Sequence, residues 1–186
     1  MTIRVGIVGT GLIGEDHGRR LAGVIRGANV NAVADVRRER AQEVAGVVGG
    51  ARVFENGLEL IASDEVDAVL VTSIGETHAE YVLACIDAGK PVMCEKPLAP
   101  TVAECERIIA AEAAFGRQLV NVGFMRRYDL GYPHVKASLE RGTIGDPLIL
   151  HNIHRNSVVP ESYTSFMTMT DSMIHEVDVS RWLLDE

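Results

Sequence analysis

The sequence predicts an α/β fold: a doubly wound parallel sheet followed by the beginning of a second, α+β domain. Short apolar stretches alternate with longer helical stretches over the first two thirds of the 186 residues. The short stretches are apolar at successive positions, as expected of strands buried on both faces. Repeated strand–helix units with right-handed crossovers build a doubly wound sheet. The alternation stops after Gly123.

Each element of the first part follows from its pattern of residues. We expect strands at residues 3–8, 29–34, 52–54, 68–72, 92–94 and 119–122. We expect helices at residues 12–26, 36–48, 76–88 and 101–115, the last two closed by Gly89 and Gly116. The expected apolar face of the first helix consists of Leu12, Ile13, Leu21, Val24 and Ile25.

The residues after Gly123 are more polar, and they no longer alternate between short apolar stretches and helical stretches. We expect a helix at 129–141, a long polar strand at 147–156, an irregular loop at 158–169 and a helix at 171–184. One strand and two helices do not bury the face of a sheet. The sequence therefore predicts a complete domain at residues 1–122 and an incomplete one at 123–186, as in a truncated chain or fragment.

Composition and charge narrow the class of protein. Lys and Arg number 18 against 26 Asp and Glu, and this net charge of −8 argues against a nucleic-acid-binding surface. No apolar run reaches the ~18–20 residues that a membrane span needs, and the N-terminus has no secretory pattern. Cys85, Cys94 and Cys105 lack metal-ligand spacing. We expect a cytoplasmic protein with no metal, membrane or nucleic-acid partner.

A glycine-rich turn follows the first expected strand. Gly9, Gly11 and Gly14 have the GxGxxG spacing of a dinucleotide-binding turn, with Leu12 and Ile13 inside it. The three glycines permit the tight turn, the approach of a pyrophosphate and close helix packing. Asp35 ends the second expected strand, where a carboxylate accepts from ribose hydroxyls and repels a 2′-phosphate. The predicted cofactor is NAD rather than NADP.

Two further features suggest chemistry. Lys96 follows the fifth expected strand, at the edge of the sheet where ligands bind, although lysines in loops are commonly just solvated. Asp171 and His175 are four residues apart on an expected helix, so they share a face. A carboxylate beside an imidazole suits proton abstraction from an alcohol, whereas an Asp171 that only caps the helix would carry no chemistry.

Taken together, these motifs resemble the Gfo/Idh/MocA oxidoreductases. The resemblance rests on the glycine turn, Asp35, the sequence Glu95-Lys96-Pro97 and the pattern Asp171-xxx-His175-Glu176-x-Asp178. It also rests on GFMRRYDLGY at 123–132 and HRN at 154–156, which are most similar to the inositol-oxidising members. The family is built from an NAD-binding Rossmann domain and a larger sheet that binds a sugar or polyol. Family members are longer and commonly homo-oligomeric, so most of the second sheet would follow residue 186.

The resemblance also implies roles for individual residues. Lys96, Asp171 and His175 would form the catalytic set. The implied substrate contacts are these three together with Arg126, His154 and Asn156. The implied cofactor contacts are those of the glycine turn and Asp35 together with Thr72, Ser73, His78 and Glu95.

The implied reaction oxidises a secondary hydroxyl of a polyol to a ketone, with myo-inositol giving 2-keto-inositol as the expected case. His175 would take the hydroxyl proton, Asp171 would orient His175, and Lys96 would stabilise negative charge on the oxygen. Two alternatives stay open. One is a dehydrogenase of the same family for another sugar or polyol, and the other is a fragment that binds NAD without catalysis.

Overall fold

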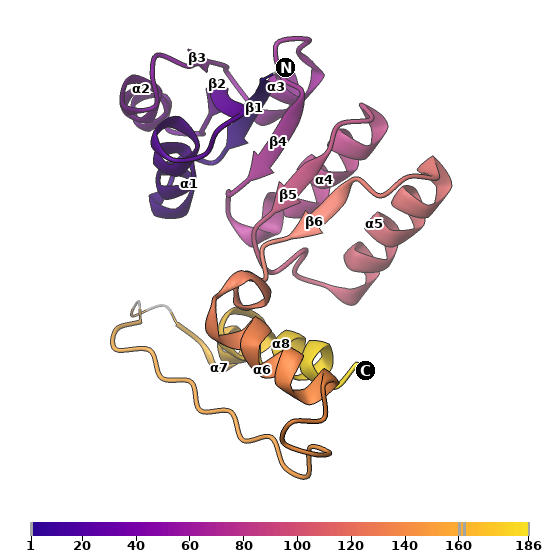
Figure 1. Cartoon of the computed structure of the whole chain (residues 1–186). Helices are drawn as coiled ribbons and strands as arrows, with labels where there is room; N and C mark the ends of the chain where they lie inside the picture. Colours follow the sequence, from indigo (N-terminus) through magenta and orange to yellow (C-terminus); the bar gives the residue numbers. More distant parts are fainter. Residues whose placement is uncertain (1, 160, 162, 186) are drawn as a thin grey trace. The chain divides into compact units, whose positions relative to one another are not determined.

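The computed structural model describes residues 2–159, 161 and 163–185 (Figure 1). The described residues fall into two compact units, one up to Gly123 and one from Phe124 onward. Within the described part of the chain, no helix has the length and apolar character to cross a membrane.

The first unit is built on a six-stranded sheet in the order β3-β2-β1-β4-β5-β6. The strands are β1 Ile3–Val8, β2 Ala28–Ala34, β3 Arg52–Val53, β4 Ala68–Val71, β5 Val92–Cys94 and β6 Val120–Val122. All five neighbouring pairs are parallel. The strand order reverses between β1 and β4, which is where a ligand crevice forms in such sheets. The predicted doubly wound fold is confirmed.

Helices cover both faces of this sheet (Figure 1). They are α1 Leu12–Gly23, α2 Arg38–Val47, α3 Gly57–Ala62, α4 His78–Asp87, preceded by the short helix η1 Gly75–Thr77, and α5 Val102–Phe115. Both ends of α5 lie within one residue of the positions that the sequence predicts. Thr101 accepts a hydrogen bond from Glu104 N at 3.2 Å, and Gly116 closes the helix with φ of 78°. The six-residue helix α3 was not predicted, because it is too short for a periodic pattern.

The core confirms that the strands are buried on both faces. Ile7 and Val33 pack on one side of the sheet with Val44 of α2. Their chain neighbours Val8 and Ala34 pack on the other side. Successive residues of a strand point to opposite faces, so both layers of the fold draw on the same strands.

The predicted apolar face of the first helix was wrong at four of its five positions. Leu12 is 87% exposed and Ile13 is 53% exposed, and the helix ends at Gly23, before Val24 and Ile25. Leu21 is partly buried and packs against the core, as predicted. The residues that α1 buries are Gly14 and Gly18. A helix that packs through glycine brings its backbone against the strand, so its larger side chains are turned outward.

The second unit consists of η2 Met125–Tyr128, α6 Gly131–Glu140, α7 Ser165–Met167, the π-helical turn η3 Thr168–Met173 and α8 Ile174–Leu184. The helix expected at 129–141 is confirmed in α6. The last helical run starts earlier than predicted, because the Thr164 side chain accepts a hydrogen bond from Met167 N at 3.3 Å and caps it. Residues 165–169 are therefore helical rather than loop, and residues 160 and 162 lie outside the described part.

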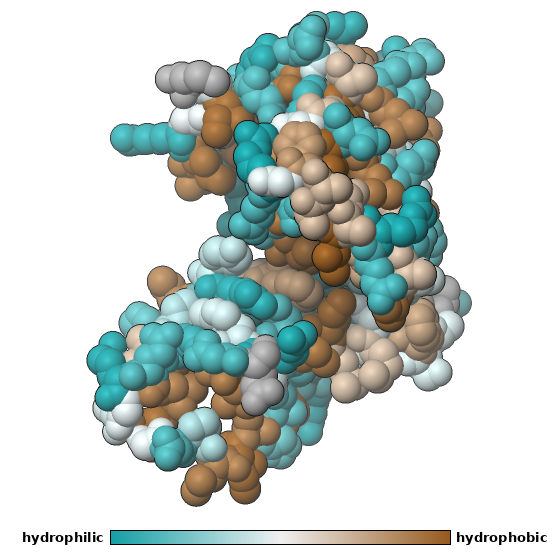
Figure 2. Space-filling view, turned by 90° about the vertical axis from the view of Figure 1, so that its right-hand side faces the viewer, coloured by the Kyte–Doolittle hydropathy of each residue, from teal (hydrophilic) through white to brown (hydrophobic). Residues whose placement is uncertain are grey.

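The strand predicted at 147–156 was also wrong. Residues 148–156 form no strand pairing within the described part of the chain. A strand needs a neighbour for its backbone N–H and C=O groups, and the residues of the segment alone do not supply one. Within this segment, Leu148 and Ile149 are both highly exposed. Figure 2 shows hydrophobic side chains at the surface of the molecule among hydrophilic ones.

Candidate functional site

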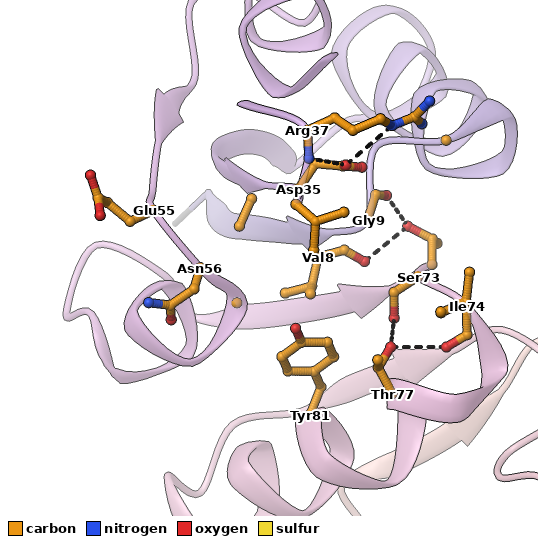
Figure 3. Close-up of a pocket in the computed structure, with 15 residues that line it drawn as sticks. Val8, Gly9, Asp35, Arg37, Glu55, Asn56, Ser73, Ile74, Thr77 and Tyr81 are labelled. Carbon is orange, nitrogen blue, oxygen red and sulfur yellow. Dashed lines mark hydrogen bonds and ion pairs between the residues drawn. The ribbon is translucent and has the colours of Figure 1, made fainter. Parts of the chain in front are cut away.

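A cleft of about 380 Å³ opens beyond the carboxyl ends of β1, β2 and β4 in the first unit. Figure 3 shows Asp35 and Arg37 across the cleft from Thr77 and Tyr81, with Val8 between them. The residues that line the cleft are Val8, Gly9, Gly11, Ala34, Asp35, Val36, Arg37, Glu55, Asn56, Gly57, Thr72, Ser73, Ile74, Thr77 and Tyr81. The cleft lies at the point where the strand order reverses.

The glycine turn at this cleft is fixed by close backbone contacts. Gly9 has φ of +94°, and a Cβ there would lie 2.5 Å from Ser73 N. A Cβ on Gly14 would lie 2.1 Å from Gly9 O. A Cβ on Gly11, by contrast, would meet nothing within 4 Å, so this glycine leaves open space rather than filling a tight contact. That space is what a bound pyrophosphate requires.

Helix α1 starts at this turn. Its first intrahelical hydrogen bond joins Glu15 N to Gly11 O at 3.0 Å. The N–H groups of Leu12, Ile13 and Gly14 precede that bond and have no carbonyl partner within the helix. Such N–H groups and the helix dipole favour an anion. The exposed side chains of Leu12 and Ile13 do not line the cleft, so any contribution from them comes through the backbone.

Asp35 is held firmly at the end of β2. Its side chain is 8% exposed, and its Oδ2 accepts from Thr10 N at 2.7 Å and from Thr10 Oγ1 at 3.0 Å. Its Oδ1 accepts from Arg37 N at 2.9 Å. Burial favours the neutral carboxyl, but these hydrogen bonds and the Arg37 charge outweigh it, so the pKa of Asp35 is lowered. A carboxylate therefore faces the cleft.

The residues after β4 secure the turn from the other side. Thr72 Oγ1 donates to Gly9 O at 2.5 Å, and the hydroxyls of Ser73 and Thr77 lie 2.8 Å apart. His78 is buried at the start of α4, with Nδ1 2.7 Å from Pro97 O and Nε2 3.0 Å from Ser73 O. Thr72 and Ser73 line the cleft. The His78 ring instead joins two loops, behind the cleft surface.

Glu95 and Lys96 follow β5. Glu95 Oε1 lies 3.0 Å from His17 Nε2, and its Oε2 accepts from Lys96 N at 3.3 Å. Burial opposes ionisation of Glu95, yet the hydrogen bond from His17 and the neighbouring positive charge lower its pKa. The Lys96–Pro97 peptide bond is cis. Neither Glu95 nor Lys96 lines the 380 Å³ cleft. His17 was not predicted as a site residue.

The two residues of the expected acid–histidine pair lie at a change of helix type in the second unit. Asp171 lies in the π-helical turn η3, and His175 is the second residue of α8. Asp171 is not a helix cap, since the cap of this run is Thr164. His175 is buried, and its ring meets that of Phe124 edge-on with centroids 6.4 Å apart. π-helical turns are frequent at functional sites.

Arg126, His154 and Asn156 come together around Glu176 in the second unit. Arg126 and His154 both contact the Glu176 carboxylate, His154 through Nδ1 at 3.2 Å. His154 Nε2 lies 3.0 Å from Asn156 Oδ1, and Asn156 Nδ2 donates to Ser172 Oγ at 3.0 Å. Burial raises the pKa of Glu176, but Arg126 and His154 lower it by more. Glu176 was not predicted as a site residue.

The spacing of polar residues along the extended segment matches the spacing of their partners along the helical run. Asn152 donates to Ser180 Oγ at 3.0 Å, so positions 152, 154 and 156 meet positions 180, 176 and 172 in turn. Two residues of extended chain advance about 6.6 Å and four of an α-helix about 6.0 Å. Asn152, His154 and Asn156 thus lie on one face of this segment, against a helix rather than a strand.

Asp178 is nearly buried and pairs with Arg127. Its side chain is 7% exposed and accepts two hydrogen bonds from Arg127 Nε, at 3.1 and 3.0 Å. This ion pair links the GFMRRYD segment to α8 within the second unit.

Several lining residues were not among the predicted site residues, among them Val36, Arg37, Asn56, Thr77 and Tyr81. For two of them, the position just after a strand could have indicated a place in the site. Arg37 lies just beyond the strand that Asp35 ends, and Asn56 lies just beyond β3, positions where ligands bind in such sheets. Tyr81 lies inside a helix and carried no such signal. Lys96 belongs to the first unit and Asp171 and His175 to the second, so their joint action stays a prediction.

Residues 3–124 match the family model GFO_IDH_MocA, described as an oxidoreductase family with an NAD-binding Rossmann fold. The chain belongs to this family. The family match confirms the resemblance expected from the motifs, and the Rossmann fold that it implies is the fold of the first unit.

Relatives within the family are named for inositol oxidation. Inositol 2-dehydrogenase 3 of Saccharopolyspora erythraea is 56% identical over 186 residues, covering 100% of this chain. The crystal structure of myo-inositol dehydrogenase from Lactobacillus casei, in complex with NAD(H) and myo-inositol, matches 100% of the chain with a TM-score of 0.95 at 39% identity. That of scyllo-inositol dehydrogenase from the same organism, with NAD(H) and scyllo-inositol, has a TM-score of 0.86 at 26% identity.

The chain spans about half the length of these relatives. It covers 55% of the Saccharopolyspora protein, 55% of the myo-inositol dehydrogenase chain and 57% of the scyllo-inositol dehydrogenase chain.

Proposed function

We propose that this chain is the NAD-binding and catalytic-residue-bearing part of an inositol 2-dehydrogenase. The observation that carries the proposal is the cleft where the strand order reverses, with an open Gly11 and an ionised Asp35, in a chain 56% identical to an enzyme of that name. In this proposal residues 1–122 bind the cofactor and residues 123–186 begin the substrate domain. We also propose a cytoplasmic location and a homo-oligomeric full-length form.

The cleft fits NAD by its chemistry. The N–H groups at the start of α1 suit the pyrophosphate, and the open side of Gly11 leaves room for it. Asp35 offers carboxylate oxygens to the ribose hydroxyls. When bound, NAD supplies the acceptor for the hydride. Thr72 and Ser73 line the same cleft, while Glu95 and His78 support the loops that follow β4 and β5.

Three side chains then have separate roles in the proposed reaction. His175 accepts the proton of the substrate hydroxyl as the carbon gives up its hydride and the oxygen becomes a carbonyl. Asp171 orients the imidazole and supports its positive charge. Lys96 donates a hydrogen bond to the same oxygen and stabilises the negative charge that develops on it. Arg126, His154 and Asn156 offer hydrogen-bonding groups for the other hydroxyls of a polyol.

Two measurements test this function. Calorimetry with the 186-residue chain is expected to detect NAD binding. A chimera in which the remainder of the Saccharopolyspora relative follows residue 186 is expected to reduce NAD with myo-inositol, followed as NADH absorbance. The control is the same chimera without inositol.

A panel of inositol isomers, other polyols and sugars separates the alternatives. Preferred turnover of another sugar or polyol would replace inositol in the proposal. If the folded chimera binds NAD but oxidises no member of the panel, the chain is an NAD-binding unit without catalysis.

NAD is expected to bind more tightly than NADP, by about tenfold or more, because Asp35 would repel a 2′-phosphate. Calorimetry with both cofactors checks this. Asp35→Asn, which removes the charge, is expected to reduce the ratio of the NADP dissociation constant to the NAD dissociation constant. Equal dissociation constants in the unmodified chain would contradict the role of Asp35.

A further inference from the structure

Thr10 sits between two glycines of the turn and is completely buried. Its N–H and its hydroxyl both donate to Asp35 Oδ2, at 2.7 and 3.0 Å. Its carbonyl oxygen accepts from Nε of Arg40, on helix α2, at 2.9 Å. The polar groups of Thr10 are thus directed at Asp35 and Arg40, and its N–H is already committed to a partner within the chain.

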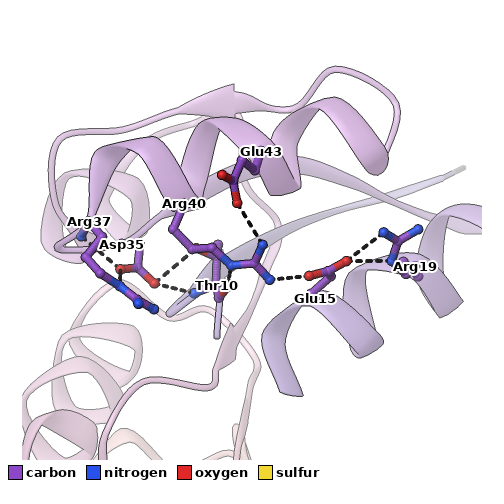
Figure 4. Close-up of polar contacts among 7 residues, drawn as sticks. All are labelled: Thr10, Glu15, Arg19, Asp35, Arg37, Arg40 and Glu43. Carbon is purple, nitrogen blue, oxygen red and sulfur yellow. Dashed lines mark hydrogen bonds and ion pairs between the residues drawn. The ribbon is translucent and has the colours of Figure 1, made fainter. Parts of the chain in front are cut away.

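The guanidinium of Arg40 makes two more contacts with its other nitrogens. Nη1 lies 2.9 Å from Glu43 Oε2, and Nη2 pairs with Glu15 (Figure 4). Only 25% of the Arg40 side chain is exposed. A planar fork with several fixed donors is the feature that distinguishes arginine from lysine at such a site.

Glu15 is the acidic residue in the first turn of α1. In the proposed function this helix end receives the pyrophosphate, so an uncompensated carboxylate here would oppose the ligand. Glu15 instead pairs with two arginines, Arg40 and the more exposed Arg19, which approaches Oε1 to 2.7 Å. These hydrogen bonds, that of Arg40 being the larger cause, lower the pKa of Glu15.

We infer that Arg40 is a positioning residue for the dinucleotide. It holds the Thr10 carbonyl in place from α2 while Asp35 holds the Thr10 N–H, and it compensates Glu15 at the mouth of the phosphate site. The inference rests on the proposed NAD binding. It assigns to α2 a part in shaping a turn that belongs to β1 and α1, without contact between Arg40 and the cofactor.

The test compares Arg40→Met with Arg19→Met. Both substitutions remove one positive charge and one partner of Glu15, but only the first releases Thr10. The affinity of the 186-residue chain for NAD and for ADP is measured by calorimetry, and its affinity for adenosine by ligand-observed NMR. Arg40→Met is expected to weaken NAD and ADP about tenfold, the effect of losing one charge-assisted hydrogen bond, and adenosine by less than about twofold. Arg19→Met is expected to weaken NAD by less than about threefold.

Arg40→Lys keeps the charge but offers one nitrogen in place of three, so its affinity for NAD is expected to lie between those of Arg40→Met and the unmodified chain. Three results would overturn the role of Arg40: binding of NAD to Arg40→Met within about twofold of the unmodified chain, equal losses for ADP and adenosine, or equal losses in the Arg40 and Arg19 variants. If the unmodified chain itself fails to bind NAD, the proposed function falls, and the inference falls with it.

Discussion

Replacing Lys96 by methionine is expected to lower the kcat of inositol oxidation in the chimera by about 10²–10³-fold, the usual cost of losing one donor to a developing oxyanion. Lys96 follows β5, at the edge of the sheet where ligands bind. Its own N–H donates to Glu95, which in turn meets His17, so the backbone around the lysine is supported from α1.

Methionine keeps an unbranched apolar side chain that is one atom shorter than that of lysine, and it removes the donor and the charge. The NAD dissociation constant and the melting temperature serve as controls, and both are expected to stay close to those of the unmodified chimera. A kcat within about threefold of the unmodified value would remove Lys96 from the catalytic set. A loss confined to NAD affinity would make it a cofactor contact instead.

Gly14→Ala is expected to destabilise the first unit by about 3 kcal/mol or more, at the top of the range for overpacking. The new methyl group would lie 2.1 Å from Gly9 O and 2.7 Å from Thr72 Oγ1. Backbone and a hydrogen-bonded hydroxyl cannot move aside as a flexible side chain does. Urea unfolding followed by circular dichroism measures the change.

Gly11→Ala supplies the matched comparison three residues away. Its methyl group meets nothing within 4 Å, so folding is expected to be unaffected while NAD binding falls by about tenfold or more. Gly46→Ala, in the last turn of α2 and also without a neighbour within 4 Å, is expected to stabilise the chain by about 0.4–1 kcal/mol. Equal unfolding free energies for the Gly11 and Gly14 variants would contradict the packing argument.

The strands were the most predictable part of the fold. A run such as Val92–Cys94 is apolar at every position, and a parallel sheet is the structure that buries all of them. Helix faces were harder, since α1 buries Gly14 and Gly18 while Leu12 and Ile13 at its start are exposed. The extended segment at 148–156 shows a further limit. Its residues at 152, 154 and 156 do share one face, but the sequence does not say whether a strand or a helix will lie beside it.

The residues of the candidate site also differ in how well the sequence predicts them. The sequence predicted residues whose position follows from the turn and the strand ends, such as Gly9 and Asp35. It did not predict Arg40 or Glu176, because their importance comes from partners 30 and 50 positions away in the chain, Thr10 and Arg126. Such pairings depend on how helices lie on a sheet or on one another, which local pattern does not specify.

The Thr10–Asp35 hydrogen bonds bear on attempts to change the cofactor. Replacing Asp35 to admit a 2′-phosphate also strips the buried Thr10 N–H of its acceptor, and an unsatisfied buried donor costs about 1–3 kcal/mol. In the proposed function, the same carboxylate therefore sets both the choice of cofactor and the stability of the loop that binds it. A redesign for NADP would have to introduce a new acceptor for Thr10 as well as a new cation for the phosphate.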